Sequence, residues 1–167
     1  MEKIVLIDSN SLNEVRTKFI ELSKKGVKTA VSAKDAEFNR KIIEGKYCDY
    51  LTDIEYSGKN ERLDQRDSGL NNVLCKLALK NNIAIGINIS KLLNLNKEQK
   101  AFYLSRIIQN IKLCRKNKTR IVLVNSKDKE NMRALLLTLG MATDNIPALK
   151  CGVCVWVLGE PGKIYTF

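Results

Sequence analysis

The sequence contains no histidine, and this absence excludes several kinds of catalytic site. Serine triads, cysteine–histidine dyads, histidine-ligated zinc and acid–base catalysis by imidazole all require that side chain. What remains available is carboxylate chemistry on a hard metal such as magnesium, which prefers oxygen ligands. An enzyme built on this chain would therefore have to work through Asp and Glu.

Long apolar runs and nucleotide-binding loops are missing as well. No stretch reaches the roughly 18 to 20 apolar residues of a membrane span, and the N-terminus MEKIVLID is strand-like and unlike a signal peptide. We therefore expect no membrane association and a cytoplasmic location. The sequence has no GxGxxG or GxxxxGK[ST] motif, and no linker, repeat or low-complexity segment. One domain over 1–167 is the simplest interpretation.

Cysteine is present in an odd number, five, which suits reduced thiols in a cytosolic protein. Cys151 and Cys154 form a CxxC, the spacing of half a zinc knuckle or of a redox pair. A tetrahedral zinc site needs two further ligands, and the sequence offers neither a second CxxC nor a histidine. The pair adjoins the apolar run VCVWVLG, where cysteines also serve as small hydrophobic residues.

Positive charge is the main excess in the composition. The 29 Lys and Arg against 18 Asp and Glu give a net charge of +11, with the basic residues spread along the chain. Such a surface favours polyanions, of which nucleic acid is the commonest and an anionic membrane surface the second. A cationic surface that serves only solubility is the alternative.

Apolar periodicity predicts strands that alternate with helices. Strands are expected at 3–7, 27–33, near 48–56, at 83–89, 120–126 and 152–159, with an extended segment at 61–65. Helices are expected at 12–26, after an N-cap at 8–10, and at 33–45, 97–118 and 128–140, with a short turn at 143–149. A further helix should begin at an N-cap on Asp67 or Ser68, bury Leu70, Val73 and Leu74, and end near Asn81.

About seven alternating units imply a parallel sheet with right-handed crossovers, either open or closed into a barrel. At 167 residues the chain is shorter than the roughly 250 residues of a typical eight-fold barrel, so a barrel would have to be compact.

Several motifs resemble the ribonuclease P protein component 3 family of archaea and eukaryotes. They are GLNNVLCKLALKNNIAIG followed by LLN, the basic segment RIIQNIKLCRKNK, a strand ending at Ser126, and then MR and LGM. The resemblance is dense from Arg66 to Met141. Two departures are an Asn72 where the family often has histidine, and a less typical segment between Ser126 and Arg133.

The resemblance implies a compact α/β barrel, TIM-like and related to polymerase-and-histidinol-phosphatase domains, that has lost their metal centre. It implies a noncatalytic RNA-binding subunit that helps the catalytic RNA of ribonuclease P remove the 5′ leader from precursor tRNA. Activity then belongs to the holoenzyme, with magnesium held mostly by the RNA and no cofactor bound by the protein. It also implies a small companion subunit with an RNA-recognition-type fold, and a heterotetramer formed by self-association.

Helical projection selects most of the candidate RNA-binding residues, while Arg66 is chosen because it lies just before a predicted helix and Arg133 because the resemblance implies it. Asn72, Lys76 and Lys80 recur at i, i+4 and i+8, opposite the apolar face of their helix. The segment 97–118 places Leu104, Ile107, Ile108 and Ile111 on a core face, with cations beside and behind it. The set of candidates is Arg66, Asn72, Lys76, Lys80, Arg106, Lys112, Arg115, Lys116, Lys118 and Arg133. Solvated lysines, and cations that complement a helix C-terminus, are the alternative interpretation.

Phe102 and Leu113 project about 20° apart on the outward side of the same helix, near Arg106. Exposed apolar residues beside arginine often mark a protein interface. The alternative is a second buried layer.

A metal-dependent phosphoesterase or nuclease of the same barrel superfamily is the rival functional hypothesis. Its candidate ligands are carboxylates at or near predicted strand ends: Asp8, Asp53, Glu55, Asp64 and Asp67. Barrel enzymes place catalytic groups at such ends, but the related metal domains depend on histidine. A structural assembly protein without RNA contacts is a third possibility.

Overall fold

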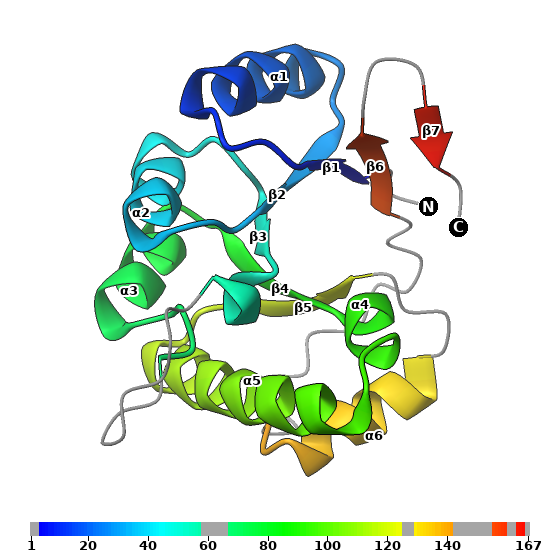
Figure 1. The fold of residues 1–167 in the computed structure, drawn as a ribbon. Helices are drawn as coiled ribbons and strands as arrows, with labels where there is room; N and C mark the ends of the chain where they lie inside the picture. The colour runs from blue at the N-terminus through cyan, green and yellow to red at the C-terminus, as the bar shows by residue number, and fades with distance from the viewer. Residues whose placement is uncertain (1–3, 58–66, 125–128, 142–154, 160–162, 166–167) are drawn as a thin grey trace.

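A computed structural model describes residues 4–57, 67–124, 129–141, 155–159 and 163–165 of the chain. Strands and helices alternate as the sequence predicts, and Figure 1 shows their arrangement. The elements are β1 (Ile4–Ile7), α1 (Leu12–Lys24), β2 (Lys28–Ser32), α2 (Ala36–Gly45), β3 (Tyr50–Thr52), η1 (Ile54–Tyr56), α3 (Asn72–Lys80), β4 (Ala84–Asn88), α4 (Ile89–Leu93), α5 (Lys97–Asn117), β5 (Ile121–Val124), α6 (Lys129–Thr138), β6 (Val155–Gly159) and β7 (Lys163–Tyr165).

The strands form one sheet in the order β5-β4-β3-β2-β1-β6-β7. Strands β1 to β5 and β6 run parallel, whereas β7 pairs antiparallel with β6. The predicted α/β class with a parallel sheet is therefore confirmed. Closure into a barrel is not confirmed, because no pairing joins β5 to β7 in the part of the chain that the structure describes.

Helices α1, α2, α3 and α5 follow one another in an arc along the outer side of β1 to β5 (Figure 1). The main core lies between these helices and the sheet and includes Ile7, Val31, Leu51, Ile85 and Ile111, each nearly fully buried. A smaller cluster on the opposite side of the sheet contains Ile4, Leu6, Ala30 and Val124. Apolar burial on both sides is typical of a parallel sheet, whose strands read as continuous apolar runs.

The start of α3 differs from the prediction. Its N-cap is Asn71, whose side chain accepts from the backbone N–H of Leu74 over 2.9 Å, and neither Asp67 nor Ser68 caps the helix. Gly69 explains the delay, because its φ of +77° is a left-handed turn that a helix cannot contain. Leu70 is buried from this turn, whereas Val73 is 58% exposed.

The first helix begins at Leu12, as predicted, but its N-cap is Ser11 and not a residue of 8–10. Three elements, η1, α4 and β7, were not predicted, and η1 occupies the end of the segment 48–56 that was expected to be a strand. The expected segments 61–65 and 143–149 and the Cys151/Cys154 pair lie outside the described residues, whereas Cys48, Cys75 and Cys114 are buried free thiols.

Candidate nucleic-acid interface

The predicted stripe on α3 lies on the surface. Asn72, Lys76 and Lys80 are all exposed, and the opposite side of the helix buries Leu74 and Ala78. Because each lysine follows the previous candidate by four residues, the three side chains project from successive turns. The geometry expected for this stripe is therefore present.

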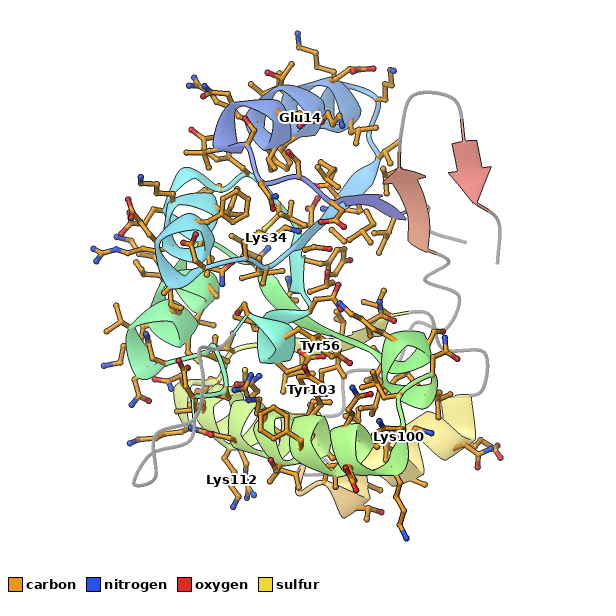
Figure 2. The ribbon with its side chains drawn as sticks, viewed as in Figure 1. Glu14, Lys34, Tyr56, Lys100, Tyr103 and Lys112 are labelled. Atoms are coloured by element: carbon orange, nitrogen blue, oxygen red, sulfur yellow. The ribbon has the colours of Figure 1, made fainter. Side chains whose placement is uncertain are left out.

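The C-terminal part of α5 supplies a second exposed set. Lys112, Arg115, Lys116 and Lys118 are exposed, and Figure 2 shows Lys112 projecting from the helix away from the sheet. Lys118 is the C-cap and adopts a left-handed conformation with φ of 58°. This position leaves its side chain in solvent, where the positive charge also complements the helix dipole.

Three hydrogen bonds join these two sets into one surface. Asn117 Nδ2 donates to Asn72 Oδ1 over 3.0 Å, at the beginning of α3. Thr119 Oγ1 donates over 3.0 Å to the carbonyl of Cys75, and the Arg120 guanidinium donates over 3.0 Å to the carbonyl of Asn82. The first bond joins the end of α5 to the start of α3, and the other two hold the segment after α5 against α3 and the residue after its C-cap. We call the exposed cations of the two helices the α3–α5 basic face: Lys76, Lys80, Lys112, Arg115, Lys116 and Lys118.

The basic residues are spread along the chain, as the sequence analysis states, but the net positive charge is concentrated in 67–124, the segment that carries this face, because acidic residues are few there. Residues 67–124 contain eleven Lys and Arg but two Asp and Glu, a net charge of +9 out of +11. Residues 1–66 contain thirteen basic and twelve acidic residues, a net charge of +1. Burial of the apolar strands leaves these cations on the helices that cover one end of the sheet.

The two parts of the chain also differ in how many of their cations form ion pairs. In the first part of the chain, lysines bind carboxylates one helical turn away, as in Lys18–Glu14, Lys25–Glu21 and Lys41–Glu37. No cation of the α3–α5 basic face forms an ion pair within the described ranges. These charges are therefore available to an external anion.

Among the candidates whose side chains the structure describes, Arg106 is the one that is buried. Its side chain is 3% exposed, its guanidinium donates over 2.9 Å to the carbonyl of Glu55, and it lies 4.5 Å from the centre of the Phe102 ring. The arginine binds η1 to α5 through this hydrogen bond. Its side chain is therefore buried and does not face a ligand at the surface, although that was the expectation. The bond spans 51 residues of sequence, which no local pattern reveals.

Two further candidates cannot be placed by their side chains. Arg66 lies outside the described residues, and Arg133 belongs to α6 by its backbone alone. Of the predicted protein interface, Phe102 is 39% exposed, whereas Leu113 is partly buried against the main core. The two residues thus differ in environment, although both lie on α5.

Two carboxylates of the rival hypothesis lie at the carboxyl ends of strands. Asp8 follows β1 and Asp53 follows β3, and both line a cleft of about 350 Å³ together with Lys34, Tyr56 and Lys91. Each carboxylate faces a lysine: Lys34 donates to Asp8, and Lys91 Nζ lies 3.6 Å from Asp53 Oδ1. Ammonium groups thus stand beside the oxygens that a metal ion would need.

Glu55 lies behind this cleft and is 1% exposed. Burial raises its pKa to about 8, and the charge of Asp53 adds to the rise. Burial also raises the pKa of Asp53, while Lys91 and Ser32 oppose that effect. Within the described ranges, no group of three His, Cys, Asp or Glu side chains could hold a metal ion. Asp67 is exposed at the loop before α3, and Asp64 lies outside those ranges.

Comparisons with known proteins bear on this arrangement. No protein-family model matches the chain. Ribonuclease P protein component 3 of Methanococcus vannielii is 28% identical over 139 residues, which cover 78% of this chain and 57% of that protein. The protein of the same name from Methanococcus maripaludis (strain C7) is 27% identical over 119 residues, covering 71% of this chain and 48% of that protein.

A solved structure agrees with these relatives. A chain in the cryo-EM structure of archaeal ribonuclease P with mature tRNA superposes with a TM-score of 0.67 at 26% identity, covering 83% of this chain and 60% of that chain. The predicted resemblance to ribonuclease P protein component 3 is confirmed. This chain spans about half the length of the component 3 proteins that it matches. Among the described residues, no helix is long and apolar enough to cross a membrane.

Proposed function

We propose that this chain is an RNA-binding subunit of ribonuclease P and that it binds the RNA of that enzyme through the α3–α5 basic face. The observation that carries the proposal is the concentration, on two helices joined by the Asn117–Asn72 hydrogen bond, of cations that form no ion pair within the described ranges. Phosphate contacts supply most of the affinity of such surfaces, because each contact releases counterions from the nucleic acid.

In this proposal the chain takes part in cleavage of precursor tRNA as part of the holoenzyme and has no catalytic site of its own. The lysines beside Asp8 and Asp53 support this, because each neutralises a carboxylate that the rival phosphoesterase would use. Magnesium is then held by the RNA. The resemblance further supports a companion subunit with an RNA-recognition-type fold, self-association into a heterotetramer, a cytoplasmic location and a sheet that curves as part of a barrel.

Salt-dependent binding to ribonuclease P RNA tests the proposal. Replacement of Lys76, Lys80 and Lys116 by alanine should weaken binding and reduce the slope of log K against log salt by up to about three. The matched control replaces Lys18, Lys25 and Lys41, which removes the same charge from cations already paired with glutamates. Equal losses in the two variants would show that net charge alone attracts the RNA, and the basic face would then not be the binding site.

The noncatalytic part needs its own measurement. Purified protein, free of RNA, should not cleave precursor tRNA or small phosphodiesters with magnesium or manganese. RNA-free cleavage that disappears on Asp8→Ala or Asp53→Ala would instead establish the phosphoesterase.

A further inference from the structure

We infer that the α3–α5 basic face binds double-helical RNA across its minor groove, with lysines on the phosphates and the Asn72–Asn117 pair on 2′-hydroxyl groups. The inference rests on the proposed function, since it specifies which form of RNA the face takes. Four features of the face support it: its residue types, its rigidity, the positions of its lysines and the unused hydrogen-bonding groups of the two asparagines.

The face offers no platform for unstacked bases. Segments 72–82 and 109–120, which build it, contain no Phe, Tyr or Trp. Proteins that bind single-stranded RNA stack its bases on aromatic side chains or arginine planes. Phe102 is exposed, but it lies ten residues before Lys112, about 15 Å along the helix, and the Arg106 guanidinium lies over its ring. Paired bases, which stay stacked on each other, need no such platform.

The cations suit phosphates better than base edges. Five of the six are lysines, which attract phosphate without directional preference, whereas arginine forms the bidentate contacts that read bases. Arg120, next to the face, already donates to the carbonyl of Asn82. A surface of this kind recognises the backbone of a nucleic acid and is indifferent to its sequence.

The lysines form two rows on rigid helices. Lys76 and Lys80 lie one turn apart on α3, and Lys112 and Lys116 lie one turn apart on α5, so the spacing within each row is about 6 Å along the helix axis. Asn72 begins the α3 row, one turn before Lys76, and the hydrogen bond from Asn117 joins that end of the row to the end of α5, next to Lys116. Cations held together on two joined helices suit the phosphates of two paired strands.

The asparagine pair presents complementary groups to a hydroxyl. Asn117 Nδ2 donates one hydrogen bond to Asn72 Oδ1, over 3.0 Å, and the other to the carbonyl of Leu113, over 2.8 Å. Within the part of the chain that the structure describes, the Asn72 amide N–H and the Asn117 amide oxygen form no hydrogen bond, so both remain for an external partner. A 2′-hydroxyl both donates and accepts, and A-form RNA displays these groups in a wide, shallow minor groove that side chains can reach. DNA lacks them.

Binding to three short ligands tests the inference: an RNA duplex of roughly 16 base pairs, a DNA duplex of the same sequence and one RNA strand alone. The RNA duplex should bind most tightly. Replacing Asn72 and Asn117 by alanine should weaken binding to the RNA duplex about fivefold, leave the DNA duplex unaffected and keep the salt slope. Asn13→Ala, an exposed asparagine on α1, is the matched control, and thermal unfolding verifies that each variant is folded.

Two results would overturn the inference. One is a single strand that binds as tightly as the duplex, and the other is an asparagine variant that loses DNA and RNA binding equally. If either occurs while the lysine variant still loses affinity for ribonuclease P RNA, the proposed function stands and the inference alone fails. Weaker binding of both duplexes by the lysine variant, together with the fivefold asparagine effect on the RNA duplex alone, would support both.

Discussion

The ammonium group of Lys91 lies 3.6 Å from Asp53 Oδ1 and 4.1 Å from the centre of the Tyr56 ring. One lysine of α4 thus contacts both a buried carboxylate after β3 and an aromatic ring of η1. Figure 2 shows Tyr56 facing Tyr103 of α5, and the two ring centres are 4.4 Å apart. Lys91 and Tyr56 therefore connect the cleft at the strand ends to the helix that carries the basic face.

Replacement of Lys91 by methionine should destabilise the fold by about 1 kcal/mol at pH 7, because a buried Asp53 carboxylate would lose its cation. Lys91 holds down the pKa of Asp53, so its removal lets burial raise that pKa further. The loss should shrink as the pH falls and Asp53 takes up a proton. Urea unfolding over a series of pH values below 7 measures this, and Lys91→Arg should behave as the wild type. A loss independent of pH would mean that the ring contact matters and the ion pair does not.

Glu55 should make the wild-type protein less stable as the pH rises. Its pKa of about 8 in the fold exceeds the ordinary value of 4.5, so between these pH values the folded state holds a proton that the unfolded state has lost. Stability therefore falls over this window, by up to about 3 kcal/mol between pH 5 and pH 7. Glu55→Gln keeps the shape and should flatten the curve, as followed by chemical denaturation. An equally steep curve in Glu55→Gln would assign the pH dependence to other groups.

A methyl group at Gly69 should disrupt the turn before α3. A Cβ there would lie 2.2 Å from the carbonyl oxygen of Ile54, and φ is +77°. Gly69→Ala should therefore cost about 2 kcal/mol or more in unfolding free energy. Gly26→Ala is the matched control, since Gly26 has φ of +67° but no atom within 4 Å of the added Cβ, and it should cost about 1 kcal/mol. Equal melting temperatures for the two variants would indicate that the loop at Gly69 yields to the methyl group.

Substitution of Phe102 tests whether this side chain contacts a protein partner or belongs to the core. Its ring is 39% exposed and packs edge-on against Tyr103, with centres 5.1 Å apart. Phe102→Ala should cost about 1 kcal/mol in folding, well below the 3 to 5 kcal/mol of a buried phenylalanine. If Phe102 contacts a protein partner, the variant should assemble less well in analytical ultracentrifugation, alone or with the companion subunit. Leu113→Ala, which loses packing against the core, should show the reverse pattern.

Sequence reasoning found the elements whose apolar residues follow one clear period. Strand β4 and helix α5 were placed within one or two residues, because an unbroken apolar run and a four-residue repeat leave little ambiguity. The start of α3 was misplaced because Leu70 fits the helical repeat although it is buried from a loop. An apolar repeat indicates which residues are buried. It does not indicate whether a buried residue belongs to a helix or to the loop before it.

The candidate site was predicted in pieces. Helical projection found Lys76 and Lys80 on one helix and Lys112 and Lys116 on another, but the joining contact between Asn72 and Asn117 spans 45 residues. The buried Arg106 likewise binds the carbonyl of Glu55, which is 51 residues away in the sequence. Such pairings depend on how helices pack, which no local spacing specifies. The net charge of +9 in 67–124 can be counted from the sequence, but the net charge of the whole chain does not show where that charge lies.

The left-handed backbone at Lys118 has a consequence for how this protein could change. Glycine is the residue that best tolerates this conformation at the end of a helix, and a side chain there costs on the order of 1 kcal/mol. Substitution by glycine would therefore make the molecule more heat-resistant while it deletes one cation from the face. At this position a change that raises thermal stability lowers the positive charge of the proposed RNA-binding surface. Selection for thermal stability alone would therefore weaken that surface.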